Sequence, residues 1–159
     1  MRKYTIAAVV VIMITAVLFC FDSCEDKGVK LALCYAETEE IIRLFDVEEG
    51  TEFSVEFIHS VNKSPVKDVF VIRDGKIIAD RTVYSAFGAG VQTEVEEGQT
   101  LSYDEDGNMI VSGFDMEFPR VKCIVGTVYD HILEIGDESI SLTELCGKNA
   151  HIYFELQRR

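Results

Sequence analysis

Basic residues are few in this sequence compared with acidic ones. The 159 residues include 15 Lys and Arg and 28 Asp and Glu, so the net charge at pH 7 is −13. A surface of this charge repels phosphate backbones and anionic lipid leaflets. The composition therefore argues against nucleic-acid binding and against adsorption to a membrane through charge. The acidic surface favours solubility, and binding of a cation or of a partner's basic patch is the weaker alternative.

The short motifs of several kinds of site are also absent. No C-x-x-C pair exists, which leaves a zinc ribbon or a thioredoxin-like site without support. The phosphate-loop pattern G-x-x-x-x-G-K-[ST] is missing as well. His59, His131 and His151 stand far apart without ligand spacing, and residues 104–108 resemble a calcium loop only in composition. We predict no metal and no cofactor.

The chain has five cysteines, and the sequence leaves their chemical state open. Cys20 lies in an apolar run near the N-terminus, and the body contains Cys24, Cys34, Cys123 and Cys146. Outside a membrane the last four could form two disulfides, with three possible connectivities. They could instead pack as buried thiols, because free cysteine behaves as a small apolar group.

Residues 4–21 form one apolar run in which only Thr5 and Thr15 are polar, and Arg2 and Lys3 precede it. A helix of this length spans about 27 Å, close to a hydrocarbon thickness of about 30 Å. Because positive flanks stay in the cytoplasm, the run predicts a single-pass membrane anchor with a cytoplasmic N-terminus. The body is then extracytoplasmic. A buried core helix is the alternative, although it does not need so unbroken an apolar perimeter.

A cleaved signal peptide is a further interpretation of this run. Residues 16–24 contain no clean small-x-small cleavage site, which favours an uncleaved anchor. The run is a little short for an anchor, so a secreted or periplasmic protein stays open. We predict an N-terminal apolar helix within residues 1–28, as anchor or signal segment, and an extracytoplasmic β-domain over residues 29–159.

The body shows a hydrophobic period of two far more often than one of 3.6. Asp74-Gly75 and Asp106-Gly107 are each typical of a two-residue hairpin turn. No spacing typical of βαβ units is present. We predict an all-β fold, either a small antiparallel β-sandwich or a partly closed barrel. The expected strands lie within residues 40–47, 51–61, 66–84, 100–113, 121–129, 131–136, 139–145 and 151–157, with a loop or an edge at 114–120.

The hairpin turns allow a register to be predicted. If Asp74-Gly75 is a two-residue loop, Asp68 faces Arg81 on the next strand. If residues 62–65 form a four-residue loop, His59 faces Asp68 on the preceding strand. The sequence thus predicts a polar row of His59, Asp68 and Arg81 across an otherwise apolar face.

Three interpretations of this row remain open. It could be a structural network that fixes the register, or a site where Arg81 or His59 binds an anion. It could also be catalytic, in a hydrolase that uses His59 and Asp68. Ser60 follows His59 directly, so on a strand its side chain points to the opposite face, and a Ser60–His59 couple is poorly arranged.

Residues 84–92 form the second unusual stretch, in which two glycines flank an alanine after an aromatic residue. Two glycines around a small residue permit a positive φ or the close approach of a ligand. The stretch predicts either a pocket lined by backbone or a tight corner where the chain leaves the sheet. With the polar row, it supplies the predicted ligand-binding or partner-binding residues: His59, Asp68, Arg81, Tyr84, Gly88, Ala89 and Gly90.

The segments HSVNKSPV, KDVFVI and TVYSAFGAGV together resemble the family of domains of unknown function called DUF 1850. The motifs cover residues 50–92, and the general pattern extends to about residue 135. Asp68 stands where the family commonly has Glu, and Val91-Gln92 where it has Leu-Pro. The matching positions are His59, Ser60, Val61, Pro65, Val66, Asp68, Phe70, Phe87, Gly88, Ala89 and Gly90.

The resemblance implies a small exported or anchored protein, of a kind often encoded near TRAP transporters of the TAXI type. We therefore expect a non-enzymatic accessory protein that binds a small solute or a transporter component in solute uptake. A purely structural interaction module and a hydrolase are the alternatives.

Overall fold

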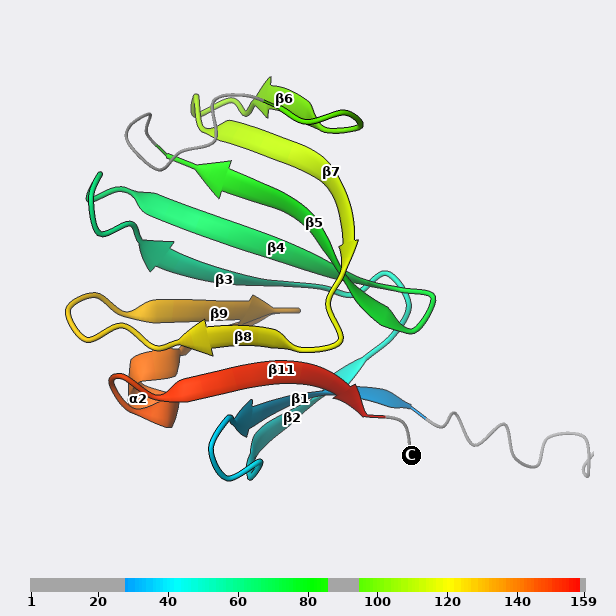
Figure 1. Cartoon of the computed structure of the whole chain (residues 1–159), viewed down its shortest axis with the longest axis vertical. Helices are drawn as coiled ribbons and strands as arrows, with labels where there is room; N and C mark the ends of the chain where they lie inside the picture. The colour runs from blue at the N-terminus through cyan, green and yellow to red at the C-terminus, as the bar shows by residue number, and fades with distance from the viewer. Residues whose placement is uncertain (1–27, 86–94, 158–159) are drawn as a thin grey trace, which may run out of the picture.

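The computed structural model describes residues 28–85 and 95–157, which fold into two antiparallel β-sheets with one short helix (Figure 1). The larger sheet has the order β10-β9-β3-β4-β5-β7-β6, and the smaller has the order β2-β1-β11-β8. The elements are β1 (Val29–Tyr35), β2 (Ile41–Val47), β3 (Glu52–Ile58), β4 (Pro65–Arg73), β5 (Lys76–Tyr84), β6 (Thr100–Tyr103), β7 (Met109–Glu117), β8 (Val121–Ile124), β9 (His131–Ile135), β10 (Glu138–Ser141), α2 (Leu142–Cys146) and β11 (His151–Gln157).

The predicted all-β class is confirmed, and the two sheets form a sandwich. No closed barrel is present in the part of the chain that the structure describes. The predicted N-terminal helix lies in residues 1–27, outside the described residues. Among residues 28–85 and 95–157, no helix has the length and apolar character that crossing a membrane requires.

The core forms where the inner faces of the two sheets meet. Phe53 on β3 stacks on Phe70 of β4 with the ring centroids 5.1 Å apart, and it lies 5.4 Å from Phe154 of β11. Leu31 and Leu133 are fully buried beside them. Each such side chain contributes roughly 1.5–3 kcal/mol on leaving water, so this layer supplies much of the stability of the sandwich.

The hairpin at Asp74-Gly75 has the predicted two-residue loop, because Arg73 pairs with Lys76 and both central residues have positive φ. The hairpin between β6 and β7 exists as well, but its loop is longer than predicted. The Asp104 backbone N–H donates to the Asn108 carbonyl, and the Asp104 carboxylate accepts the N–H groups of Asp106 and Asn108. This turn accounts for the calcium-like composition of residues 104–108.

The segment 139–145, predicted as a strand, is half strand and half helix. β10 ends at Ser141, whose Oγ accepts the backbone N–H of Glu144 at 3.0 Å and so caps α2. A serine followed three residues later by glutamate is a known signature of a helix start. Here that local signal outweighs the period-two pattern that predicted a strand.

The two sheets differ in width, and this shapes the candidate site. In Figure 1, β5, β7 and β6 occupy the end of the large sheet that lies farthest from the four-stranded sheet. The chain between β7 and β8 passes from one sheet to the other, and β8 is an edge strand of the small sheet. Phe70 on β4 and Ile77 on β5 pack into the core between the sheets, and the candidate site lies where β4 and β8 line one cleft.

Candidate functional site

The predicted pairing of His59 with Asp68 is wrong. Asp68 pairs with Val55 of β3, whereas the His59 N–H donates to the Ser64 carbonyl at 2.9 Å. The turn consists of residues 60–63 rather than 62–65, and Lys63 adopts a positive φ of 55°. Asp68 lies four residues beyond Ser64, which corresponds to about 13 Å along the strand. His59 and Asp68 thus do not form a couple.

The predicted pairing of Asp68 with Arg81 is also wrong. The β4–β5 register follows the prediction from the turn as far as Phe70 and Ala79, and it then shifts so that Asp68 pairs with Thr82. The extra residue is Asp80, which makes a β-bulge. A shift of one residue moves a side chain to the other face, so Arg81 lies on the outer face of the sheet.

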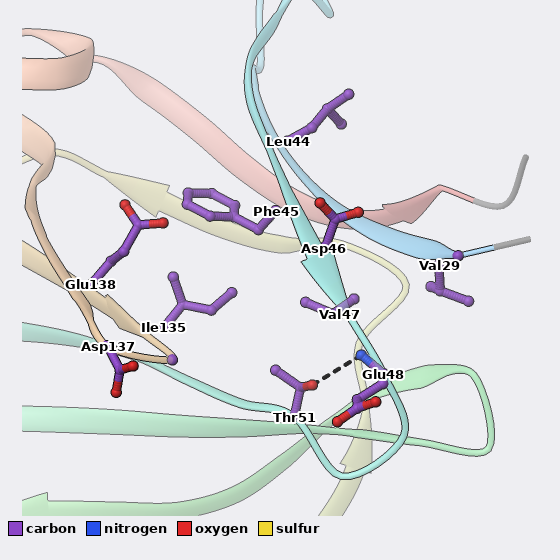
Figure 2. A pocket seen from close by; sticks show the side chains of 12 residues that line it. Val29, Leu44, Phe45, Asp46, Val47, Glu48, Thr51, Ile135, Asp137 and Glu138 are labelled. Carbon is purple, nitrogen blue, oxygen red and sulfur yellow. Dashed lines mark hydrogen bonds between the residues drawn. The ribbon is translucent and has the colours of Figure 1, made fainter. Parts of the chain in front are cut away.

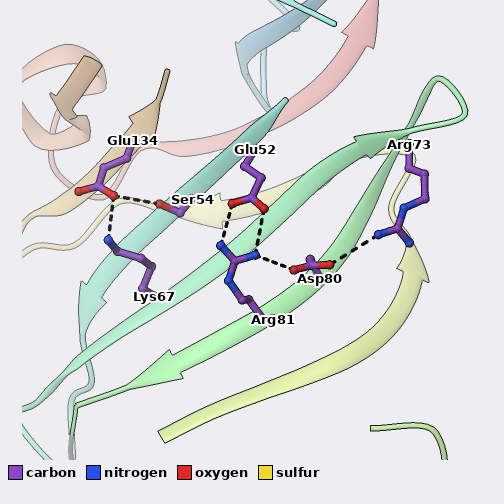
Figure 3. Close-up of polar contacts among 7 residues, drawn as sticks. All are labelled: Glu52, Ser54, Lys67, Arg73, Asp80, Arg81 and Glu134. Carbon is purple, nitrogen blue, oxygen red and sulfur yellow. Dashed lines mark hydrogen bonds and ion pairs between the residues drawn. The ribbon is translucent and has the colours of Figure 1, made fainter. Parts of the chain in front are cut away.

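On that outer face Arg81 belongs to an ion-pair network (Figure 3). Its guanidinium donates to both carboxylate oxygens of Glu52, at 2.7 and 3.1 Å, and to Asp80 at 2.7 Å. The hydrogen bonds from Arg81 lower the pKa of Glu52. Lys67 pairs with Glu134 at 2.8 Å on the same face. Because the donors of Arg81 are engaged with two carboxylates, the predicted anion-binding role is not supported by its contacts.

The side chain of His59 contacts the backbone of the turn that follows it. Its Nδ1 faces the backbone N–H groups of Val61 and Asn62, each at 3.4 Å. The next residue of the turn, Lys63, places its Nζ 5.7 Å from the ring centroid of Tyr129, in the loop before β9. These contacts favour the structural interpretation of the histidine motif.

The remaining motif residues divide into surface and core positions. Ser60 and Val61 are exposed in the turn, and Pro65 begins β4, where its carbonyl accepts the N–H and the hydroxyl of Ser85. Val66 and Phe70 are buried.

The end of β5 leads into the second predicted stretch. Tyr84 is the last residue of β5 and pairs with Val66 and Met109. Phe87, Gly88, Ala89 and Gly90 lie outside the described residues.

Asp68 faces the inside of the sandwich and lines a cleft between the two sheets. The cleft has a volume of about 510 Å³. Its walls come from β3, β4, β8, β9 and the β7–β8 connection: Val55, Phe57, Asp68, Phe70, Phe118, Arg120, Val121, Lys122, Cys123, Ile124 and His131. Apolar side chains predominate on these walls, and Asp68 is the only carboxylate among them.

A second cavity, of about 210 Å³, adjoins the first. It extends over the inner face of β5 and β7, where Thr82, Phe114 and Met116 line it. Asp68, Phe70 and Phe118 line both cavities, and the rings of Phe70 and Phe118 meet edge to face with their centroids 6.1 Å apart. The carboxylate of Asp68 therefore stands at the junction of the two cavities.

The environment of Asp68 is unusual for a charged group. Its Oδ1 accepts a hydrogen bond from the Thr82 hydroxyl at 2.7 Å. It takes part in none of the ion pairs formed within residues 28–85 and 95–157. Burial raises the pKa of Asp68, and the hydrogen bond from Thr82 offsets this only in part. A carboxylate placed in this way is a candidate for ligand contact, since perturbed groups in clefts often have that role.

His131 also lines the cleft, although its position in the sequence had raised only the question of metal binding. Its ring stacks on Phe57 with centroids 5.5 Å apart, and its Nδ1 accepts the Gly126 N–H at 3.0 Å. With Nδ1 as acceptor, the neutral ring has its proton on Nε2. Burial lowers the pKa of His131, while the nearby Asp130 opposes this shift.

Three cysteines fall within the described residues, and all are free thiols: Cys34, Cys123 and Cys146. Of the two states left open, the free thiol applies to these three. Cys34 and Cys146 are buried, Cys123 is half-buried, and Cys24 lies outside the described residues. Burial raises the pKa of Cys123 to about 11 and that of Cys146 to about 11. Although Cys123 shares the cleft with His131 and Asp68, it is a protonated thiol and a poor nucleophile at neutral pH.

Another hollow, of about 730 Å³, lies between the end of β2 and the β9–β10 turn (Figure 2). The side chains of Asp46, Glu48, Asp137 and Glu138 surround it, and all four are exposed. Asp46 pairs with Lys30, and Glu138 pairs with Arg43 at 2.5 Å. No group of His, Cys, Asp and Glu in the described ranges could hold a metal ion. Water or a paired cation satisfies exposed carboxylates of this kind, so the cleft at Asp68 is the stronger candidate site.

Comparison with known proteins gave one match. The model of the family described as "Domain of unknown function (DUF1850)" matches residues 53–142, which is more than half of the 159 residues. No curated protein and no solved structure matches the chain. The matched segment runs from β3 into the start of α2 and includes every residue that lines the cleft. The chain belongs to the DUF1850 family.

Proposed function

We propose that this protein is a non-enzymatic binding module that holds a small organic solute in the cleft between its two sheets. The observation that supports this most is the position of Asp68. Its carboxylate stands at the junction of two cavities with largely apolar walls, where it has a hydrogen bond from Thr82 and no cationic partner among the described residues. Asp68 is half-buried, and a charge removed from water without a cationic partner destabilises a fold, so its presence favours a functional role.

The size and chemistry of the cleft support a small ligand. Pockets for small molecules commonly measure about 300–1,000 Å³, with apolar walls and a few polar groups that orient the ligand. The cleft of about 510 Å³ lies in this range. Asp68 and the ring of His131 supply polar groups, and Phe57, Phe70 and Phe118 supply apolar surface.

The state of the polar groups favours binding over catalysis. A hydrolase needs a nucleophile activated by a base. The high pKa of Cys123 keeps it protonated, and the Nδ1 of His131 is engaged by Gly126. The couple of His59 and Asp68 that a hydrolase would use is not formed, because the two residues pair with different partners.

The cellular setting forms part of the same proposal. The apolar run of residues 4–21 anchors the protein in the cell membrane with the β-domain outside, and the protein assists solute uptake by a TRAP-type transporter. The charge pattern of the N-terminus supports the anchor, and the family resemblance suggests the transporter link. Membrane fractionation followed by protease treatment of intact cells tests the anchor. Recovery of the uncleaved chain in the soluble fraction would argue against it.

A second candidate is partner binding, with a transporter component as the partner. Apolar side chains are exposed in two loops at the same end of the molecule, namely Val61 in the β3–β4 turn and Val128 and Tyr129 in the β8–β9 loop (Figure 1). Co-purification of the transporter with the wild-type chain, and its loss on Val61→Ser and Val128→Ser, would favour this role.

The binding proposal is tested by a thermal-shift screen of the full chain against amino acids, organic acids, amines and neutral alcohols. The matched variants are Asp68→Asn and Glu56→Gln. Each removes one carboxylate charge, but Glu56 lies on the outer face, beside Lys67. We expect a ligand that stabilises the wild type and Glu56→Gln and has at least about tenfold weaker affinity for Asp68→Asn. If no compound of any charge class shifts the wild type, the proposed function fails.

A further inference from the structure

We infer that the ligand of this cleft has an ammonium group, which binds at Asp68, on an apolar body that fills the larger cavity. This inference rests on the proposed function and names the chemical class of its ligand. Three features of the walls lead to it: the carboxylate at the junction, the aromatic rings around that junction, and the engagement of the neighbouring basic groups.

The carboxylate favours a cationic group on the ligand. Asp68 accepts one hydrogen bond from Thr82 and has no cationic partner among the described residues, so its second oxygen remains available to a donor. An ammonium group supplies both the donor and the opposite charge, and such charge-assisted hydrogen bonds are roughly twice as strong as neutral ones. An anionic ligand would instead meet a like charge at the centre of the site.

The aromatic rings favour the same charge. Phe57, Phe70 and Phe118 line the cleft together with Asp68, and Phe70 and Phe118 also line the smaller cavity. The face of an aromatic ring attracts a cation, and a cage of rings is a common way to hold substituted ammonium groups. The edge-to-face contact of Phe118 with Phe70 holds these two rings in different orientations around the junction.

The basic groups near the cleft are engaged elsewhere or turned outward. Arg120 donates to Glu155 at 2.9 Å and to Glu39 at 3.3 Å, and its guanidinium lies 4.4 Å from the ring centroid of Tyr153. Lys122 pairs in the sheet with Tyr153, and its side chain is exposed. Arg81 borders the smaller cavity, but its guanidinium donates to Glu52 and Asp80 on the outer face. Among the described residues, Asp68 therefore has no cation paired with it. The net charge of −13 further raises the local concentration of cations near the protein.

The apolar body of the ligand follows from the rest of the lining. Val55, Val121 and Ile124 also line the larger cavity, and these side chains offer no hydrogen-bonding groups. An aryl or alkyl chain a few carbons long fits such walls, whereas a sugar or a polyol would lose its hydrogen bonds to water there.

Three probes of similar shape separate the charge classes: 2-phenylethylammonium, 3-phenylpropanol and 3-phenylpropanoate. Isothermal titration of the full chain at pH 7 measures the Kd of each probe for the wild type, Asp68→Asn, Glu56→Gln and Phe118→Leu. We expect the ammonium probe to bind at least about tenfold more tightly than the alcohol, and the carboxylate to bind most weakly. Asp68→Asn should remove this preference and Glu56→Gln should keep it. Phe118→Leu, which keeps an apolar wall, should weaken the ammonium probe more than the alcohol.

Several outcomes would overturn the inference. Tighter binding of the carboxylate would assign the site to anions held by Lys122 or Arg120, and equal binding of all three probes would mean that charge plays no part. In both cases the cleft still binds a solute, so the proposed function survives. If none of the three probes binds, the inference fails, and the broader screen separately decides whether the cleft binds any solute.

Discussion

The carboxylate of Asp68 and the hydroxyl of Thr82 lie 2.7 Å apart on neighbouring strands, both facing the inside of the sandwich. The bulge at Asp80 creates this pair, because without it Thr82 would not lie opposite Asp68. Thr82 is a buried polar residue, and its hydroxyl donates to a carboxylate that lacks a cationic partner in the described structure. The bulge thus places the Thr82 hydroxyl, rather than the Arg81 guanidinium, opposite the one acidic side chain that lines the cleft.

The first prediction concerns the stability of the Asp68→Asn variant. Burial raises the folded-state pKa of Asp68 above 3.8, so its stabilising contribution is full below that value and is lost as the pH rises through the folded pKa. Asparagine keeps the shape and accepts the Thr82 hydrogen bond without a charge. We expect Asp68→Asn to be more stable than the wild type by about 1 kcal/mol at pH 7, with a smaller difference near pH 4. Urea unfolding at both pH values measures this, and a less stable variant at pH 7 would contradict it.

The second prediction concerns His131 and pH. Its folded-state pKa is lowered from 6.5, so the stability that it contributes is present above 6.5 and is lost as the pH falls through the folded pKa. Protonation also removes the acceptor for the Gly126 N–H. We expect His131→Gln, whose amide oxygen can accept that hydrogen bond, to reduce the loss of stability between pH 7.5 and 5 by about 1 kcal/mol. Denaturation of the two proteins across this range provides the check. If the free energy of unfolding depends on pH equally in the two proteins, His131 is not the titrating group.

The third prediction concerns Gly126, which allows the loop before β9 to pack closely. A Cβ at this position would lie 2.1 Å from the Tyr129 carbonyl oxygen and 2.9 Å from Nδ1 of His131. We expect Gly126→Ala to destabilise the fold by about 2–3 kcal/mol and to disturb the stacking of His131 on Phe57. The matched control is Gly136→Ala, where no atom lies within 4 Å and only the positive φ of 55° opposes the substitution. This control should lose about 1 kcal/mol. Equal losses in the two variants, measured by thermal unfolding, would refute the packing argument.

The fourth prediction concerns the thiols. Burial raises the pKa of Cys123 and of Cys146 to about 11, so neither forms much thiolate at pH 7.5. We expect both to react with iodoacetamide far more slowly in the folded chain than after unfolding in guanidinium. Mass spectrometry of digested samples locates the modified residues. Rapid labelling of Cys123 in the folded protein would show that it is a reactive thiolate. Cys123 would then be a candidate nucleophile for catalysis.

The sequence predicted the fold class well because the relevant signals are local. Asp-Gly dipeptides between alternating segments indicate hairpins, and the Asp74-Gly75 turn forms as expected. Two elements, α2 and β1, were not predicted. Ser141 and Glu144 have the spacing of a helix cap, which would have located α2. β1 was not predicted as a separate strand, because its apolar run lacks alternation.

The site was harder to predict, for a geometric reason. Placing the turn two residues earlier moves His59 from Asp68 to Ser64 and leaves every side chain on the same face, so the apolar pattern cannot distinguish the two registers. The bulge at Asp80 leaves no mark in the pattern of apolar residues. Asp68 was correctly selected as a polar residue on the inner face. Its neighbours in the cleft come from β8 and β9, which are distant in sequence, so they could not be identified from the local pattern.

A crystal of the chain soaked with the tightest ligand from the screen would show most directly whether the cleft at Asp68 binds a small solute. We expect ligand density between the sheets, with a donor atom of the ligand within about 3 Å of the Asp68 carboxylate and its apolar part against Phe57 and Phe118. A saturated crystal with an empty cleft and the ligand bound elsewhere on the protein would contradict it.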